Sequence, residues 1–176
     1  YDLPAAIGVA VENRDKRVVL VTGDGSMQMN IQELQTILNY GLNVKIVYLS
    51  NNVYMTIRNT QKAMFNGKFT ASDESDGLEM PCIERIARAY GYEYFQIIGN
   101  SDLETNLRSA LQWDDHPTIC EVLIDPNQTC YPKTALRVDV NGNKKQMPLE
   151  DMYPFLPREE FKKLMIVKLH PNSDYE

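Results

Sequence analysis

Arg17 to Gln61, RVVLVTGDGSMQMNIQELQTILNYGLNVKIVYLSNNVYMTIRNTQ, is the stretch that decides the fold. Two short apolar runs in it, Val18 to Thr22 and Val44 to Leu49, are rich in β-branched residues, which is typical of buried strands in a parallel sheet. The amphipathic segment from Ile31 to Tyr40 predicts a helix between them that ends at Gly41. The stretch therefore predicts a βαβ crossover.

Each predicted strand ends at a polar loop. Gly23-Asp24-Gly25-Ser26 follows the first strand, and Ser50-Asn51-Asn52 follows the second. The glycines let backbone N–H groups approach a ligand closely, while the asparagines supply neutral amide oxygens. Because a right-handed crossover brings the carboxyl ends of the two strands side by side, we expect both loops to border one crevice.

These groups suit a magnesium ion that carries a diphosphate. One carboxylate and a few neutral oxygens are too few for a protein-only cage, but Mg²⁺ is usually held by one or two carboxylates plus substrate phosphates. Backbone N–H groups from Gly25 to Met27, at the start of the next helix, are placed to bind those phosphates. Gly-Asp-Gly also occurs in ordinary strand-to-helix turns, so a plain nucleotide-binding crossover is the alternative. The joint spacing of the two loops favours the Mg²⁺-diphosphate site.

Gly-Asp-Gly at 23–25 with Asn-Asn at 51–52 resembles the thiamine diphosphate signature. The surrounding sequence resembles the pyrophosphate-binding domain of the acetolactate synthase and 2-oxo-acid decarboxylase group, with good coverage from Tyr1 to about Pro132. The segments that carry the likeness outside the motif are Tyr1–Gly8, Met29–Leu34, Ile57–Gln61 and Pro117–Ile124.

The resemblance implies a set of site residues. Asp24 and Asn51 would ligate Mg²⁺ through their side chains and Val53 through its carbonyl, because the group's metal amide falls 27 positions after its aspartate. A register shifted by one residue would instead use Asn52 and the Tyr54 carbonyl. The cofactor-binding residues implied are Gly23, Asp24, Gly25, Ser26, Met27, Asn51, Val53 and Tyr54.

The resemblance also implies an activity. It predicts a thiamine diphosphate- and Mg²⁺-dependent enzyme that acts on a 2-oxo acid, by decarboxylation or by transfer of the acyl carbanion. The activating glutamate belongs to a pyrimidine-binding domain of the same or a partner subunit, so we expect no catalytic residue in this chain and interpret Glu33 as a solvated or capping residue. We expect an N-terminally truncated fragment, inactive alone, of a homodimeric or homotetrameric enzyme.

Two alternatives stay open at this point. Acetolactate synthases typically carry a Trp in the segment after the Asn pair, at the position matched to Thr60, so a related enzyme with another acyloin or sugar-precursor product is credible. A different class of protein, a non-catalytic nucleotide-binding or regulatory α/β module, would use the same strand-to-helix turn.

Composition excludes several functions. The chain has 176 residues, 43% of them hydrophobic, and a net charge of −6, which argues against nucleic-acid or anionic-membrane partners. Its three cysteines lack C-x-x-C spacing, so a zinc site is not expected and a reducing compartment is indicated. No apolar run reaches the length of a membrane span, and we expect a cytoplasmic protein.

The remaining pattern completes an α/β three-layer sandwich with a mainly parallel sheet, the thiamine diphosphate-binding fold. Further strands are predicted at 92–98 and 118–124. Residues 62–80 read as a long loop, either a lid or a disordered insert. We assign residues 1–132 to the pyrophosphate-binding domain and 133–176 to a C-terminal tail that packs on the domain or on a partner subunit.

Overall fold

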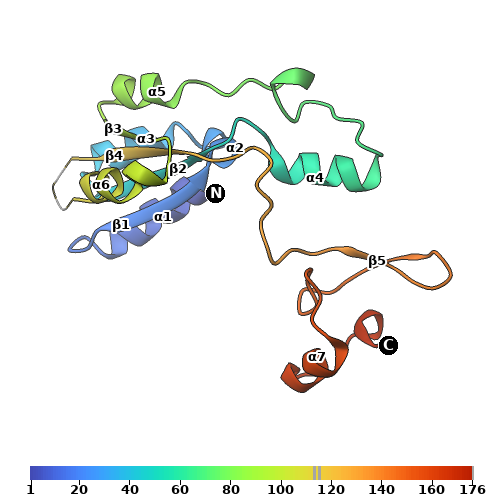
Figure 1. Cartoon of the computed structure of the whole chain (residues 1–176). Helices are drawn as coiled ribbons and strands as arrows, with labels where there is room; N and C mark the ends of the chain where they lie inside the picture. The colour runs from blue at the N-terminus through green and yellow to red at the C-terminus, as the bar shows by residue number, and fades with distance from the viewer. Residues whose placement is uncertain (113, 115, 176) are drawn as a thin grey trace. The chain divides into compact units, whose positions relative to one another are not determined.

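The computed structural model describes residues 1–112, 114 and 116–175 (Figure 1). The chain divides into two compact units, Tyr1–Asn127 and Gln128–Glu176. No helix in the described part of the chain is long and apolar enough to cross a membrane.

A four-stranded parallel sheet forms the centre of the first unit. Its strands, in spatial order, are β1 (Val18–Gly23), β2 (Val44–Ser50), β4 (Thr118–Leu123) and β3 (Glu93–Ile97). All three neighbouring pairs run parallel, and Gly23 at the end of β1 lies opposite Leu49 of β2. The predicted α/β class with a parallel sheet is therefore confirmed, and the two polar loops leave the same edge of the sheet.

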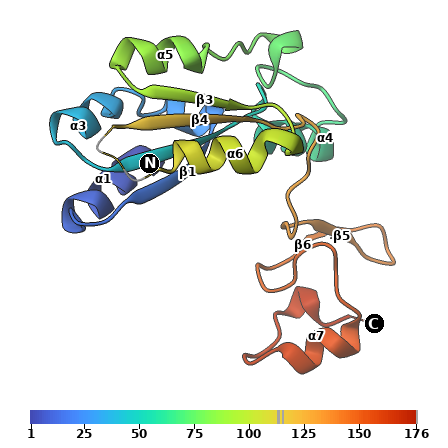
Figure 2. The same cartoon turned by 60° about the vertical axis from the view of Figure 1, so that its left-hand side comes forward.

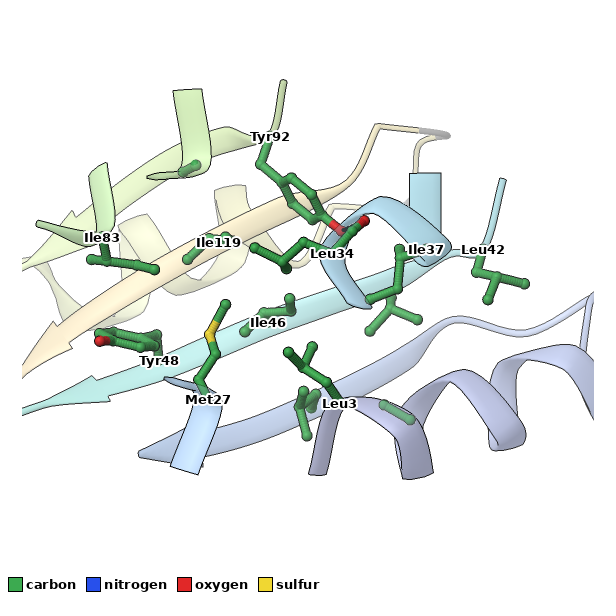
Figure 3. Close-up of a cluster of buried hydrophobic side chains, with 14 of the residues drawn as sticks. Leu3, Met27, Leu34, Ile37, Leu42, Ile46, Tyr48, Ile83, Tyr92 and Ile119 are labelled. Atoms are coloured by element: carbon green, nitrogen blue, oxygen red, sulfur yellow. Dashed lines mark hydrogen bonds between the residues drawn. The ribbon is translucent and has the colours of Figure 1, made fainter. Parts of the chain in front are cut away.

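Helices cover both faces of this sheet (Figures 1 and 2). They are α1 (Asp2–Glu12), α2 (Asp24–Gln28), α3 (Glu33–Asn39), α5 (Ile83–Tyr90) and α6 (Asn100–Ala110). Helix α4 (Met55–Met64) follows the Ser50–Asn52 loop, and none of its residues is buried. Side chains of α1, α3 and α5 share one core cluster with Leu20, Ile46 and Ile119, as Figure 3 shows for part of the cluster. Helix α6 packs on the opposite face against Ile97 and Cys120.

The crossover helix predicted over Ile31–Tyr40 is present as α3, but it begins two residues later than predicted, at Glu33. Tight turns link α2 to α3: the Glu33 amide donates to the Asn30 carbonyl at 2.9 Å and the Leu34 amide to the Ile31 carbonyl at 3.1 Å, both three residues back, as in a 3₁₀ turn. The end of the helix agrees with the prediction, because Gly41 follows α3 with φ of +57°. The apolar positions Leu34 and Ile37 are fully buried.

The segment predicted as a loop over 62–80 is more ordered than expected. Helix α4 continues to Met64, and a short 3₁₀ helix, η1 (Glu74–Asp76), is capped by Asp73, whose carboxylate accepts the Ser75 amide at 2.9 Å. Ser72 is fully buried. Residues 62–80 therefore form a folded segment and not a disordered insert.

The second unit contains a hairpin and short helices. Its elements are β5 (Leu136–Val138), β6 (Lys144–Gln146), α7 (Arg158–Leu164) and η2 (Pro171–Ser173). The hairpin turn forms at Asn141-Gly142-Asn143, where Asp139 accepts the amides of residues 141 and 143, each at 2.9 Å. Arg158 forms a two-pronged ion pair with the buried Asp151, at 2.7 and 2.9 Å.

Candidate functional site

Asp24 joins the two polar loops. It begins α2 immediately after β1, and its side chain is 4% exposed. One carboxylate oxygen accepts the Gly25 amide at 2.7 Å, and the other accepts the amides of Asn51 at 3.0 Å and Asn52 at 2.7 Å. The two loops, which the crossover predicts to lie side by side, are therefore joined directly by hydrogen bonds.

The two asparagines differ in orientation. The Asn51 side chain is half-buried, and its Oδ1 accepts the Val53 amide at 3.1 Å, which shapes an Asx turn. Asn52 is exposed and has a left-handed backbone with φ of +57°, a conformation that asparagine tolerates better than most residues. Because an amide oxygen has two lone pairs, the Asn51 oxygen keeps the capacity for a second contact.

Tyr54 covers the middle of the glycine loop. A Cβ placed on Gly25 would lie 2.3 Å from Cε1 of the Tyr54 ring, so only glycine leaves room for this ring. The Tyr54 amide donates to the Ser72 carbonyl at 2.8 Å, which ties the residue to the loop after α4. At Gly23, by contrast, an added Cβ would meet nothing within 4 Å.

The other residues predicted for the site, Met27, Ser26 and Val53, belong to the same two loops. Met27 is fully buried in the core, Ser26 is exposed, and Val53 is 8% exposed. The structure therefore brings the predicted site residues of both loops to one edge of the sheet. Glu33 is the first residue of α3 and is half-buried; its carboxylate accepts the Thr36 hydroxyl at 2.8 Å and caps no backbone amide among the described residues, so it is not the capping residue expected.

The electrostatics of Asp24 fit a bound cation. No Lys, Arg or His in the described ranges forms an ion pair with this buried carboxylate, which has only backbone N–H donors. Burial raises the pKa of the neighbouring Tyr48 phenol, and the charge of Asp24 raises it further. No group of three His, Cys, Asp or Glu side chains suited to a metal occurs within the described residues. A divalent ion at Asp24 would thus depend on amide, carbonyl and ligand oxygens, the set that Mg²⁺ accepts.

Two side chains of α4 are bound to the following loop. Arg58 forms an ion pair with Asp73, and its guanidinium lies 4.0 Å from the centre of the Phe69 ring. The Gln61 side chain donates to the Thr70 carbonyl at 2.9 Å. Both side chains are half-buried, because the loop folds back on the helix.

Sequence reasoning missed a polar cluster around the buried Glu121 on β3 and β4. Glu121, 9% exposed, accepts hydrogen bonds from the Tyr94 hydroxyl and from Gln96 at 3.0 Å. The available signal was a glutamate inside the otherwise apolar run TICEVLI, because a charged residue in a buried strand requires partners.

The first unit is a parallel α/β domain. Its buried carboxylate and its amide-rich loop lie at the carboxyl ends of neighbouring strands, which is typical of domains that bind ligands at that edge of the sheet. Residues 1–122 match the family described as "Thiamine pyrophosphate enzyme, C-terminal TPP binding domain". The chain belongs to this family.

Known relatives agree with this assignment. The chain is 37% identical over 134 residues to the acetolactate synthase isozyme 3 large subunit of Escherichia coli K12, and 34% identical over 135 residues to the acetolactate synthase large subunit of Porphyra purpurea. These matches cover 75% and 77% of this chain but 23% and 22% of the relatives. The chain thus spans less than a quarter of the length of the curated relatives it matches.

Among solved structures, the chain resembles the thiamine diphosphate-dependent 4-hydroxybenzoylformate decarboxylase of Rhodococcus jostii RHA1. The TM-score is 0.62 at 29% sequence identity, and the match covers 73% of this chain and 23% of that one. The predicted relationship to acetolactate synthases and 2-oxo-acid decarboxylases is therefore confirmed at the level of the family.

Proposed function

We propose that this chain is the thiamine diphosphate- and Mg²⁺-binding domain of an acetolactate synthase-like enzyme that decarboxylates 2-oxo acids or transfers the resulting acyl carbanion. The observation that carries the proposal is the buried carboxylate of Asp24, which ties both loops together through backbone amides and forms no ion pair with any Lys, Arg or His that the structure describes. Family membership supports the cofactor, and the relatives support the reaction class.

Three oxygens of the chain would hold the metal: the carboxylate of Asp24, the amide oxygen of Asn51 and the carbonyl of Val53. Gly23, Gly25, Ser26, Met27 and Tyr54 would contact the cofactor around them. Thiamine diphosphate held in this crevice would supply a thiazolium ylid as the nucleophile for the substrate carbonyl and a thiazolium ring as the electron sink for the carbanion. The chain's own contribution is to fix the diphosphate end, because Asp24 offsets the metal charge and the loop amides orient the carboxylate.

Catalysis would require a second domain. No residue of this chain is proposed as catalytic, and the group that activates the cofactor would come from a pyrimidine-binding domain of the same or a partner subunit, in a cytoplasmic homodimer or homotetramer. We also propose that residues 1–132 form the pyrophosphate-binding domain and that residues 133–176 pack on it or on a partner. Thr60 stands at the position where acetolactate synthases typically carry a Trp, so the identity of the 2-oxo acid stays open. Its hydroxyl donates to the Thr56 carbonyl at 3.1 Å.

The experiment compares metal-dependent cofactor binding by calorimetry in the polypeptide that also contains the pyrimidine-binding domain. Asp24→Ala removes the single carboxylate assigned to the metal, so binding of Mg²⁺-thiamine diphosphate should be lost. Asn51→Ala should weaken binding far more than the matched control Asn52→Ala, because the Asn52 side chain is exposed and Asn51 shapes the loop.

Several results would contradict the proposal. Wild-type affinity in Asp24→Ala would remove the metal site, and a greater loss in Asn52→Ala would shift the ligands to Asn52 and the Tyr54 carbonyl. Tight binding of ATP or NAD without any Mg²⁺-dependent binding of thiamine diphosphate would favour the nucleotide-binding module instead. Turnover of pyruvate by the 176 residues alone would show that a second domain is not needed.

A further inference from the structure

A second pocket lies across the Ser50–Asn52 loop from the proposed cofactor crevice. It has a volume of about 600 Å³, within the range of small-molecule sites, and it opens between the carboxyl ends of β2, β3 and β4 and the start of α5. Neither Asp24 nor Asn51 lines it. The pocket is therefore distinct from the metal ligands proposed above.

Glu121 presents one unoccupied carboxylate oxygen in this pocket. Glu121 lies opposite Gln96 in the β3–β4 register, and the side chains of Tyr94 and Gln96 share a strand face because they are two residues apart. Both donate to the same oxygen, Oε2. Among the described residues none donates to Oε1, although the side chain is nine-tenths buried and lines the pocket.

The charge of Glu121 has no cationic partner in the described part of the chain. Glu84, which also lines the pocket, is paired with Arg88 at 2.8 Å, and Arg85 forms no ion pair with Glu121. Burial raises the pKa of the Tyr94 phenol, and its hydrogen bond to Glu121 raises it further, so Tyr94 remains a donor to the carboxylate. A buried carboxylate in this situation is stabilised by a cation that also donates hydrogen bonds.

A second acceptor faces the same space. Ser50 lines the pocket and is 6% exposed, and its hydroxyl makes no hydrogen bond with a described residue. Apolar atoms of Ile83 and Leu123 form part of the wall. The described residues contain no set of three acidic, His or Cys side chains suited to a metal ion, so the lining fits an organic cation better than a metal.

We propose that this pocket binds a small organic molecule with a primary ammonium group. The ammonium donates to Oε1 of Glu121 and to the Ser50 hydroxyl, and the apolar part of the molecule packs against Ile83 and Leu123. The proposal stands independently of the cofactor assignment, because it uses neither the metal ligands nor the glycine loop.

The test is a titration of the full chain with n-butylammonium, followed by NMR shifts of the Gln96 side-chain amide, which contacts Glu121. Saturable binding is expected. Glu121→Gln should weaken it at least tenfold, since the variant keeps the shape but removes the charge. The matched control is Glu93→Gln, an exposed glutamate of β3 that does not line the pocket, and it should bind like the wild type.

Two further probes test the chemistry without any variant. 1-Pentanol has a similar apolar chain without charge, and n-butyltrimethylammonium has the charge without an N–H donor, so both should bind at least tenfold more weakly than n-butylammonium. Equal binding of either probe, absence of n-butylammonium binding, or undiminished binding in a folded Glu121→Gln would overturn the proposal. The probe comparison decides it even where Glu121→Gln does not fold.

Discussion

Gly25→Ala tests the contact between the glycine loop and Tyr54. The added Cβ would lie 2.3 Å and 2.5 Å from two ring carbons of Tyr54, well inside van der Waals contact. The Tyr54 amide donates to the Ser72 carbonyl at 2.8 Å, so relief of the clash requires rotation of the ring about χ1 or loss of this backbone hydrogen bond. Overpacking of this kind costs about 1–3 kcal/mol, whereas Gly→Ala in a helix by itself stabilises by about 1 kcal/mol.

The two effects separate in a second background. In Tyr54→Ala the clash is absent, so Gly25→Ala should raise the free energy of unfolding there and lower or leave it unchanged in the wild type. The difference between the backgrounds should be about 1–3 kcal/mol, which corresponds to a shift of roughly 1 M in the urea midpoint. Gly23→Ala is the control, because its Cβ meets nothing within 4 Å and the expected cost is about 0.5 kcal/mol.

Urea unfolding monitored by circular dichroism measures these differences, with the slope of the transition checked for constancy. Equal effects of Gly25→Ala in both backgrounds would refute the reasoning, because they would show that the Tyr54 ring does not occupy the space beside Gly25. A loss in Gly23→Ala as large as in Gly25→Ala would refute it as well.

Three other predictions concern other parts of the first unit. The hydrogen bond from Lys45 lowers the pKa of Asp114. The stability that this ion pair contributes is therefore present above about pH 4 and is lost as the pH falls through the lowered pKa. Lys45→Met should make acid unfolding less steep in that pH range. Burial raises the pKa of Cys120 to about 11, so a thiol reagent at pH 8 should modify it at least about a hundredfold more slowly than the two exposed cysteines. Arg58→Gln should release the segment 69–76 and increase its amide hydrogen exchange about tenfold.

Each of these has a contradicting result. An unchanged acid-unfolding profile in Lys45→Met would show that its bond to Asp114 is not maintained in solution. Labelling of Cys120 at the rate of the exposed cysteines would show that β4 is accessible to solvent. Unchanged exchange over 69–76 in Arg58→Gln would show that other contacts hold the segment.

The strands and the two loops could be predicted because their signals are local. β-branched runs mark β1 and β2, and Gly, Asp and Asn mark the turns that follow them. The topology then fixes which chain ends meet, since a right-handed crossover allows one arrangement. This is why Asp24 and the asparagine pair were placed together from the sequence.

The break between α2 and α3 and the contacts of the site depend on information that the pattern does not contain. Apolar spacing continues through residues 29–32, so periodicity cannot reveal turns closed by backbone hydrogen bonds. The donors to Asp24 are backbone amides, which every residue has, so no residue type indicates them. The pocket at Glu121 arises only when α5 and the ends of three strands come together.

The bridge made by Asp24 also bears on how the chain assembles. Its donors on the second loop lie 27 and 28 residues away, and β1 and β2 are joined by one short crossover, whereas β2 meets β4 only after the segment between residues 45 and 118 has been closed. Short loops close with less loss of entropy, so the first crossover can form before the rest of the sheet. A nascent chain that has left the ribosome only as far as Asn52 already contains the carboxylate and both of these amides.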